Sequence, residues 1–141
     1  ERGAMAAFVL SSYLQGGALI YSSQEVAFPG CVDFFHYCHV DWNAKNEIRK
    51  EYEILMRLYN DYPAIRKGHL EVYPDCNIAA FQKELAQERF LVAVNVRNAA
   101  RTFLLPKEWA GHECIDACKD TLDVLPDTLC LAPYEYRILK Y

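Results

Sequence analysis

Long apolar runs, basic clusters and low-complexity stretches are all absent from this 141-residue chain. Its longest apolar stretch, Ala4 to Leu14, is interrupted by two serines and is far shorter than the ~20 residues that a membrane-spanning helix needs. The net charge is −4, without a cluster of Lys or Arg that would attract nucleic acid or an anionic membrane. We therefore expect neither nucleic acid nor a membrane as a partner.

The sequence also lacks an initiator methionine and a charged, signal-like start ahead of an apolar segment. We expect it to be a fragment of a longer gene product. With 52% hydrophobic and 24% charged residues, it has the composition of one folded globular domain or of two small ones.

A repeating cysteine framework is missing as well. Four of the six cysteines lie in apolar, strand-like segments, which favours free buried thiols in a reducing compartment and predicts a cytoplasmic location. The even number also permits disulfides, and a thiol titration in denaturant distinguishes the two. The six are Cys31, Cys38, Cys76, Cys114, Cys118 and Cys130.

The clearest element is an amphipathic helix from Asn43 to Ile65, with its charged residues on the face opposite an apolar stripe. Pro63 disfavours helical geometry in the residue before it, so we expect the helix to end there. The stripe consists of Ile48, Tyr52, Leu55, Met56, Tyr59 and Tyr62.

The residues before this helix resemble part of an α/β layer. Gly3 to Leu14 is apolar on every face, which predicts a helix covered on most sides and stopped by the glycines that follow. Ala18 to Tyr21 is short and wholly apolar, as in a strand buried in a parallel sheet. One strand makes no sheet, so its neighbours must come from outside this chain. The long connection from Ser22 to Trp42 is where we expect any site.

After Gly68 the apolar residues alternate with period two, and turn residues separate eight short strands. Such regular spacing predicts an antiparallel, Greek-key-like β-sandwich. Its core would be small, so we expect it to lean on the helix from Asn43 to Ile65.

In this order the parts resemble the C-terminal portion of the alpha-amylase family of glycoside hydrolases. The motifs that carry the likeness are GGALIYSSQE at 16–25, the helix exit around Arg57 to Gly68, FLVAVNV at 90–96 and LAPYEYRILK at 131–140. Two features depart from the family pattern: Ala18 stands where proline is usual, and Ser22-Ser23 where Tyr-Gly is usual. The rim of the pocket should differ accordingly.

The resemblance implies an α+β fragment in two domains. Residues 1–66 would be the remnant of a (β/α) TIM-type barrel, and residues 67–141 the C-terminal sandwich. It also implies that the parent cleaves α-glucosidic bonds of starch or maltooligosaccharides, and that its catalytic carboxylates lie upstream. This chain then has no catalytic residue, metal or cofactor of its own, and calcium would bind upstream in the parent. Its partners would be the rest of the barrel, an α-glucan and, through the uncovered remnant, further copies of the chain.

Retaining glycoside hydrolysis needs two carboxyl groups roughly 5 to 5.5 Å apart. Glu25 follows the predicted strand, at the catalytic face of such a barrel, and is either a substrate-rim residue or a carboxylate paired within the loop. Asp33 and Asp41 are expected to be solvated. Gln24, His36 and His39 complete the set of candidate rim residues.

Two further features of the long connection allow alternatives. Cysteine and histidine side chains at 31–39 could bind zinc, although their spacing matches no finger or ribbon. The aromatic residues could stack on sugar rings or instead plug the barrel end against the helix. They are Phe34, Phe35, Tyr37 and Trp42.

Two other functions remain open. One is a non-catalytic carbohydrate-binding or structural β-sandwich. The other is a family relative that transfers or isomerises glucosyl groups, since the deciding residues would lie upstream.

Overall fold

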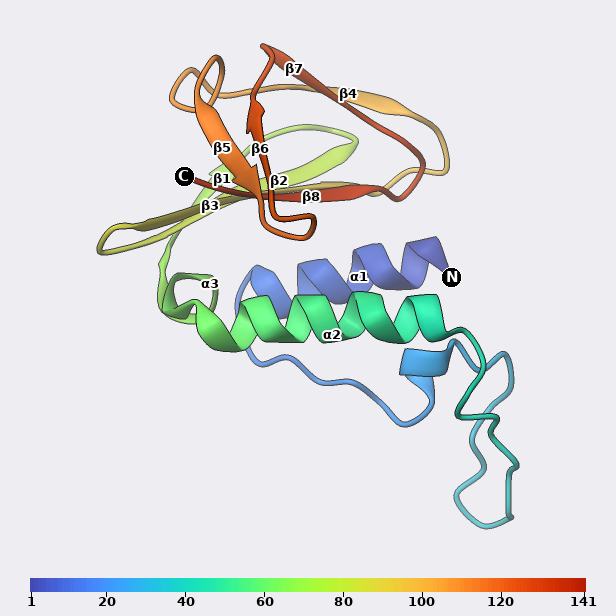
Figure 1. Cartoon of the computed structure of the whole chain (residues 1–141). Coiled ribbons are helices and arrows are strands. Elements are labelled where there is room, and N and C mark those ends of the chain that lie inside the picture. The colour runs from blue at the N-terminus through green and yellow to red at the C-terminus, as the bar shows by residue number, and fades with distance from the viewer.

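A computed structural model describes all 141 residues as a layer of helices packed on one face of an antiparallel sheet (Figure 1). The helices are α1 (Arg2–Tyr13), the 3₁₀ turn η1 (Gln24–Val26), α2 (Asn46–Asp61) and α3 (Pro63–Lys67). The strands are β1 (His69–Tyr73), β2 (Ile78–Leu85), β3 (Glu88–Asn95), β4 (Arg101–Leu104), β5 (Glu113–Asp116), β6 (Thr121–Val124), β7 (Thr128–Leu131) and β8 (Tyr136–Lys140).

All eight strands predicted from the period-two pattern are present, and all pair antiparallel. Six form one sheet in the order β1-β2-β3-β8-β5-β6, and β4 and β7 form a second, two-stranded sheet. After β3 the chain builds β4 to β7 and then returns, so that β8 lies between β3 and β5. This return produces the expected Greek-key-like connection.

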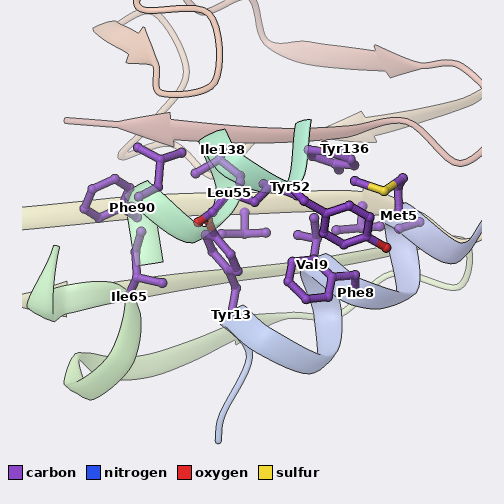
Figure 2. Close-up of a cluster of buried hydrophobic side chains, with 14 of the residues drawn as sticks. Met5, Phe8, Val9, Tyr13, Tyr52, Leu55, Ile65, Phe90, Tyr136 and Ile138 are labelled. Atoms are coloured by element: carbon purple, nitrogen blue, oxygen red, sulfur yellow. The ribbon is translucent and has the colours of Figure 1, made fainter. Parts of the chain in front are cut away.

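The large sheet is buried on both faces because residues along β3 alternate between two cores. One face, with Phe90, Val92 and Val94, packs against the helices. Figure 2 shows Phe90 on this face. The other face, with Leu91 and Ala93, packs under the two-stranded sheet and its connections. The sandwich therefore leans on the helical layer, as predicted.

Helix α2 is shorter than predicted at both ends. It begins at Asn46 because Lys45 adopts a left-handed conformation (φ 51°) that no α-helix can include. It ends at Asp61, and Pro63 opens a separate short helix, a position where its missing N–H costs nothing.

The first helix forms as predicted, but only one of its sides is covered. Met5, Phe8, Val9 and Tyr13 point into the core, as Figure 2 shows, whereas Ala4, Ala7, Ser11 and Leu14 are exposed. The expectation of cover on most sides is thus wrong within this chain. No helix is long and apolar enough to cross a membrane.

The predicted strand from Ala18 to Tyr21 is also wrong. The segment is extended but pairs with no strand, and the side chains of Leu19 and Tyr21 are 78% and 51% exposed. A strand needs partners for its backbone groups, and this chain offers none beside it. The barrel remnant is therefore not confirmed, and the α+β class here describes helices on an antiparallel sheet. Helices end at Lys67 and strands begin at His69, while the division into domains 1–66 and 67–141 stays a prediction.

Candidate functional site

A hollow of about 710 Å³ lies where the N-terminal ends of α1 and α2 face the segment from Tyr21 to Val32. It therefore occupies part of the long connection in which a site was expected. Its walls include Met5, Tyr21, Gln24, Phe28, Ile48 and Tyr52.

Two left-handed residues shape the floor of this cavity. Ser23 (φ 70°) and Ala27 (φ 49°) flank η1, and the carbonyl oxygen of Ser23 accepts the N–H of Phe28 at 3.2 Å. Non-glycine residues in this region cost energy and persist only where the surroundings hold them. At Gly30 a Cβ atom would lie 2.8 Å from the ring of Phe28, so glycine allows the chain to pass this ring.

Gln24 connects this turn to helix α2. Its side-chain amide donates a hydrogen bond to the hydroxyl of Tyr52 at 2.8 Å and accepts one from the N–H of Tyr21 at 3.2 Å. Burial raises the pKa of Tyr52, so the hydroxyl keeps its proton and can still donate to a ligand in the cavity.

One carboxyl side chain, Glu1, lines the cavity, and it pairs with Lys45 at 3.0 Å. The hydrogen bond from Lys45 lowers the pKa of Glu1. Retaining hydrolysis needs a second carboxyl group roughly 5 to 5.5 Å from the first. The lining of the cavity therefore lacks the pair of carboxyl groups that retaining hydrolysis requires.

Glu25 faces away from this cavity into a hollow of about 350 Å³ beside α2, which is also lined by Arg49 and Glu53. One of its carboxylate oxygens is buried without a hydrogen-bond partner. The proposed pairing within the loop is therefore absent for this oxygen, while a role at the substrate rim stays a prediction.

His36 and His39 lie on the exposed part of the loop between η1 and α2. Asp33 accepts the N–H groups of Phe35 and His36 at 2.7 and 3.0 Å, and these bonds, the one from Phe35 first, lower the pKa of its carboxyl group. The Nδ1 of His36 is 3.1 Å from Asp33, and the Nδ1 of His39 is 3.4 Å from the hydroxyl of Tyr37.

The four candidate rim residues are thus not brought together: Gln24 lines the cavity, Glu25 the smaller hollow, and the histidines neither. No three His, Cys, Asp or Glu side chains are grouped so that they could hold a metal ion, which leaves the zinc alternative without ligands. Within this chain three of the four aromatic residues are largely exposed rather than packed on the helix, and their role at a barrel end stays a prediction. The exposed fractions are 85% for Phe34, 93% for Phe35, 90% for Tyr37 and 48% for Trp42.

A second, charged cleft of about 400 Å³, which no sequence pattern predicted, lies between the helices and the sheet. Glu51 in α2 accepts two hydrogen bonds from Arg2 at 2.9 and 2.7 Å and one from the hydroxyl of Tyr136 in β8. Burial and this acceptor raise the pKa of Tyr136. These residues are far apart in the sequence, and no local pattern predicts their contact.

Comparisons with solved structures show where this architecture recurs. An alpha-amylase from Anoxybacillus matches 98% of this chain over 31% of its own (19% identity, TM-score 0.78). A maltogenic amylase from S. marinus matches 99% over 19% of its own (19% identity, TM-score 0.78). An isomaltulose synthase from Klebsiella sp. LX3 matches 66% over 17% of its own (25% identity, TM-score 0.56).

No family profile matches the sequence. No curated protein is significantly similar to it in sequence. The predicted resemblance to the alpha-amylase family is thus confirmed as a shared fold, and the chain spans about a third or less of each structure named here. It has the architecture of one part of these larger proteins.

Proposed function

We propose that this chain is the C-terminal structural part of an enzyme that acts on α-glucosidic bonds of starch or maltooligosaccharides. In this role it completes and caps a catalytic barrel whose carboxylates lie elsewhere in the polypeptide. The supporting observation is the fit of 98% of the chain onto 31% of an alpha-amylase. A cavity lined by one carboxyl side chain agrees with a supporting role rather than a catalytic one.

Uncovered apolar surface on the helical side supports the same proposal. Leu14, Leu19 and Tyr21 are 38%, 78% and 51% exposed, and the alanines Ala4 and Ala7 of α1 also face solvent. Apolar groups gathered on one side of a protein mark a surface that another structure covers. We assign this cover to the remainder of the barrel.

A charge placed on this surface tests the assignment. Leu19→Asp should leave the thermal stability of the 141-residue chain unchanged, because the side chain is already in water. In the longer protein it should abolish folding or the release of reducing sugar from maltooligosaccharides, because burying an unpaired carboxylate is costly. Leu122→Asp on β6, a residue 65% exposed, is the matched control and should be tolerated in both.

Two results would contradict the proposal. One is release of reducing sugar by the isolated chain at the rate of the longer enzyme. The other is equal tolerance of Leu19→Asp and Leu122→Asp in the longer protein.

The likeness to isomaltulose synthase favours a variant of this function, in which the parent transfers or isomerises glucosyl groups. Product analysis of the longer protein on sucrose and on maltooligosaccharides distinguishes the two. Isomers without free glucose indicate the synthase-like reaction, and shortened oligosaccharides indicate hydrolysis.

The exposed aromatic side chains of the loop favour a second candidate function, a carbohydrate-binding module. Isothermal titration of the isolated chain with maltoheptaose tests it. Binding that is lost in Phe35→Ala and retained in Leu122→Ala supports the module, and absence of binding supports the capping role alone.

A further inference from the structure

The loop from Ala27 to Lys45 carries two free cysteines, and the thiol of one contacts the backbone of the other. Figure 1 shows the loop as a lobe that projects away from the helices near the start of α2. Cys31 is exposed and Cys38 partly so, and the thiol of Cys38 points at the carbonyl oxygen of Cys31 at 3.9 Å. The two residues are seven positions apart.

A turn between them holds this arrangement. The carboxylate of Asp33 accepts the N–H groups of Phe35 and His36, which folds the chain back on itself. Because the enclosed segment is short and already folded, joining its ends costs little further chain entropy.

The remaining cysteines differ from this pair. Burial raises the pKa of Cys114, and it raises that of Cys118 to about 12, which suppresses the thiolate needed for disulfide exchange. Cys76 lies in the connection between β1 and β2 and Cys130 in β7, so these two exposed thiols belong to separate elements.

We propose that Cys31 and Cys38 form a disulfide that closes the neck of this lobe and fixes its aromatic tip. The oxidant is a small-molecule disulfide such as oxidised glutathione. One cysteine thiolate attacks it, forms a mixed disulfide and releases one glutathione thiol. The second thiolate then attacks the protein sulfur of the mixed disulfide and releases the other. Two protein thiols are oxidised while one glutathione disulfide is reduced to two thiols.

Peptide mapping after incubation of the chain in a glutathione redox buffer tests the proposal. We expect a cross-link between Cys31 and Cys38, and a decrease of two in the six thiols titrated in denaturant. Cys31→Ser should leave Cys38 as a mixed disulfide with glutathione, while the control Cys76→Ser should keep the cross-link. Separate glutathione adducts on Cys31 and Cys38 in the unmutated chain, two unreacted thiols there, or a cross-link that instead joins Cys76 to Cys130 would each overturn it.

Discussion

Replacing Asn95 with aspartate should destabilise the sandwich far more than its small change in structure suggests. Asn95 is fully buried at the end of β3, and its amide nitrogen donates to the carbonyl oxygens of Ala99 at 2.8 Å, Leu131 at 3.1 Å and Ala132 at 2.8 Å. Its side-chain oxygen accepts the N–H of Arg97 at 2.9 Å. One side chain thus joins the chain after β3 to the chain that links β7 and β8.

Aspartate preserves the size of the side chain and the bond to Arg97 but removes both N–H donors. The second carboxylate oxygen of aspartate would then face carbonyl oxygens that have lost their hydrogen-bond donor. The two lost donors cost about 1 kcal/mol each net, and the carbonyl oxygen of Leu131, the one acceptor in a buried hydrogen bond, costs about 1 to 3 kcal/mol when left unpaired. We expect the free energy of unfolding to fall by about 3 to 5 kcal/mol, which is a large share of the ~5 to 15 kcal/mol typical of a whole domain.

Urea denaturation followed by circular dichroism measures this loss. Asn98→Asp is the matched control, because it makes the same chemical change on an exposed residue three positions along the chain. It should alter stability by less than about 0.5 kcal/mol. If Asn95→Asp stays within about 1 kcal/mol of the unmutated chain, the side chain does not hold these segments together and the reasoning is wrong.

Three further experiments test other contacts. Glu51→Ala should lower the free energy of unfolding by about 1 to 3 kcal/mol, because the part-buried hydroxyl of Tyr136 loses its acceptor. Arg2→Ala should lower it by less than about 1 kcal/mol, because that ion pair is largely solvated. Urea denaturation compares the two variants. Burial raises the pKa of Cys118 from 9.0 to about 12, so the folded chain keeps a proton that the unfolded chain loses. The stability of the folded chain therefore falls as pH rises through this range. Cys118→Ala should weaken this pH dependence in thermal melts across the same range. Desolvation lowers the pKa of the buried Lys83 from 10.5, so below that pH the unfolded chain binds a proton more readily than the folded chain does. The stability of the folded chain therefore rises as pH approaches 10.5. Lys83→Met should remove this rise, and an unchanged pH profile would contradict the assignment.

The strands could be predicted because their sequence signals are local. In β3, residues from Phe90 to Val94 alternate between the two cores, and Pro74 and Pro126 lie between strands, where proline is tolerated. The pairing order was beyond such signals. Nothing near Tyr136 in the sequence states that β8 lies between β3 and β5, since this order depends on which apolar faces fill two cores at once.

The sequence points to the long connection as the place of a site, but it does not predict the geometry of the cavity there. The long connection lines the cavity, but neither glycine nor asparagine, the residues that would predict a left-handed turn, stands at Ser23. The contact from Gln24 to Tyr52 spans 28 positions, and the apolar pattern places Tyr52 in the core stripe alone. Side chains with two roles, one in packing and one in the cavity, are not separated by periodicity.

The segment from Ala18 to Tyr21 fails for a different reason. Its pattern is that of a strand buried on both sides, yet Leu19 is 78% exposed and the backbone pairs with no neighbour. Nearby, the neighbouring helix α1 buries Phe8 and Val9 while leaving Ala4 exposed. Selection for water-exposed residues would not produce two adjacent apolar segments of this kind, but selection for burial in a larger protein would. The mismatch between pattern and exposure therefore supports a covering partner independently of any likeness to known structures, whereas the proposal that this partner is a barrel rests on that likeness.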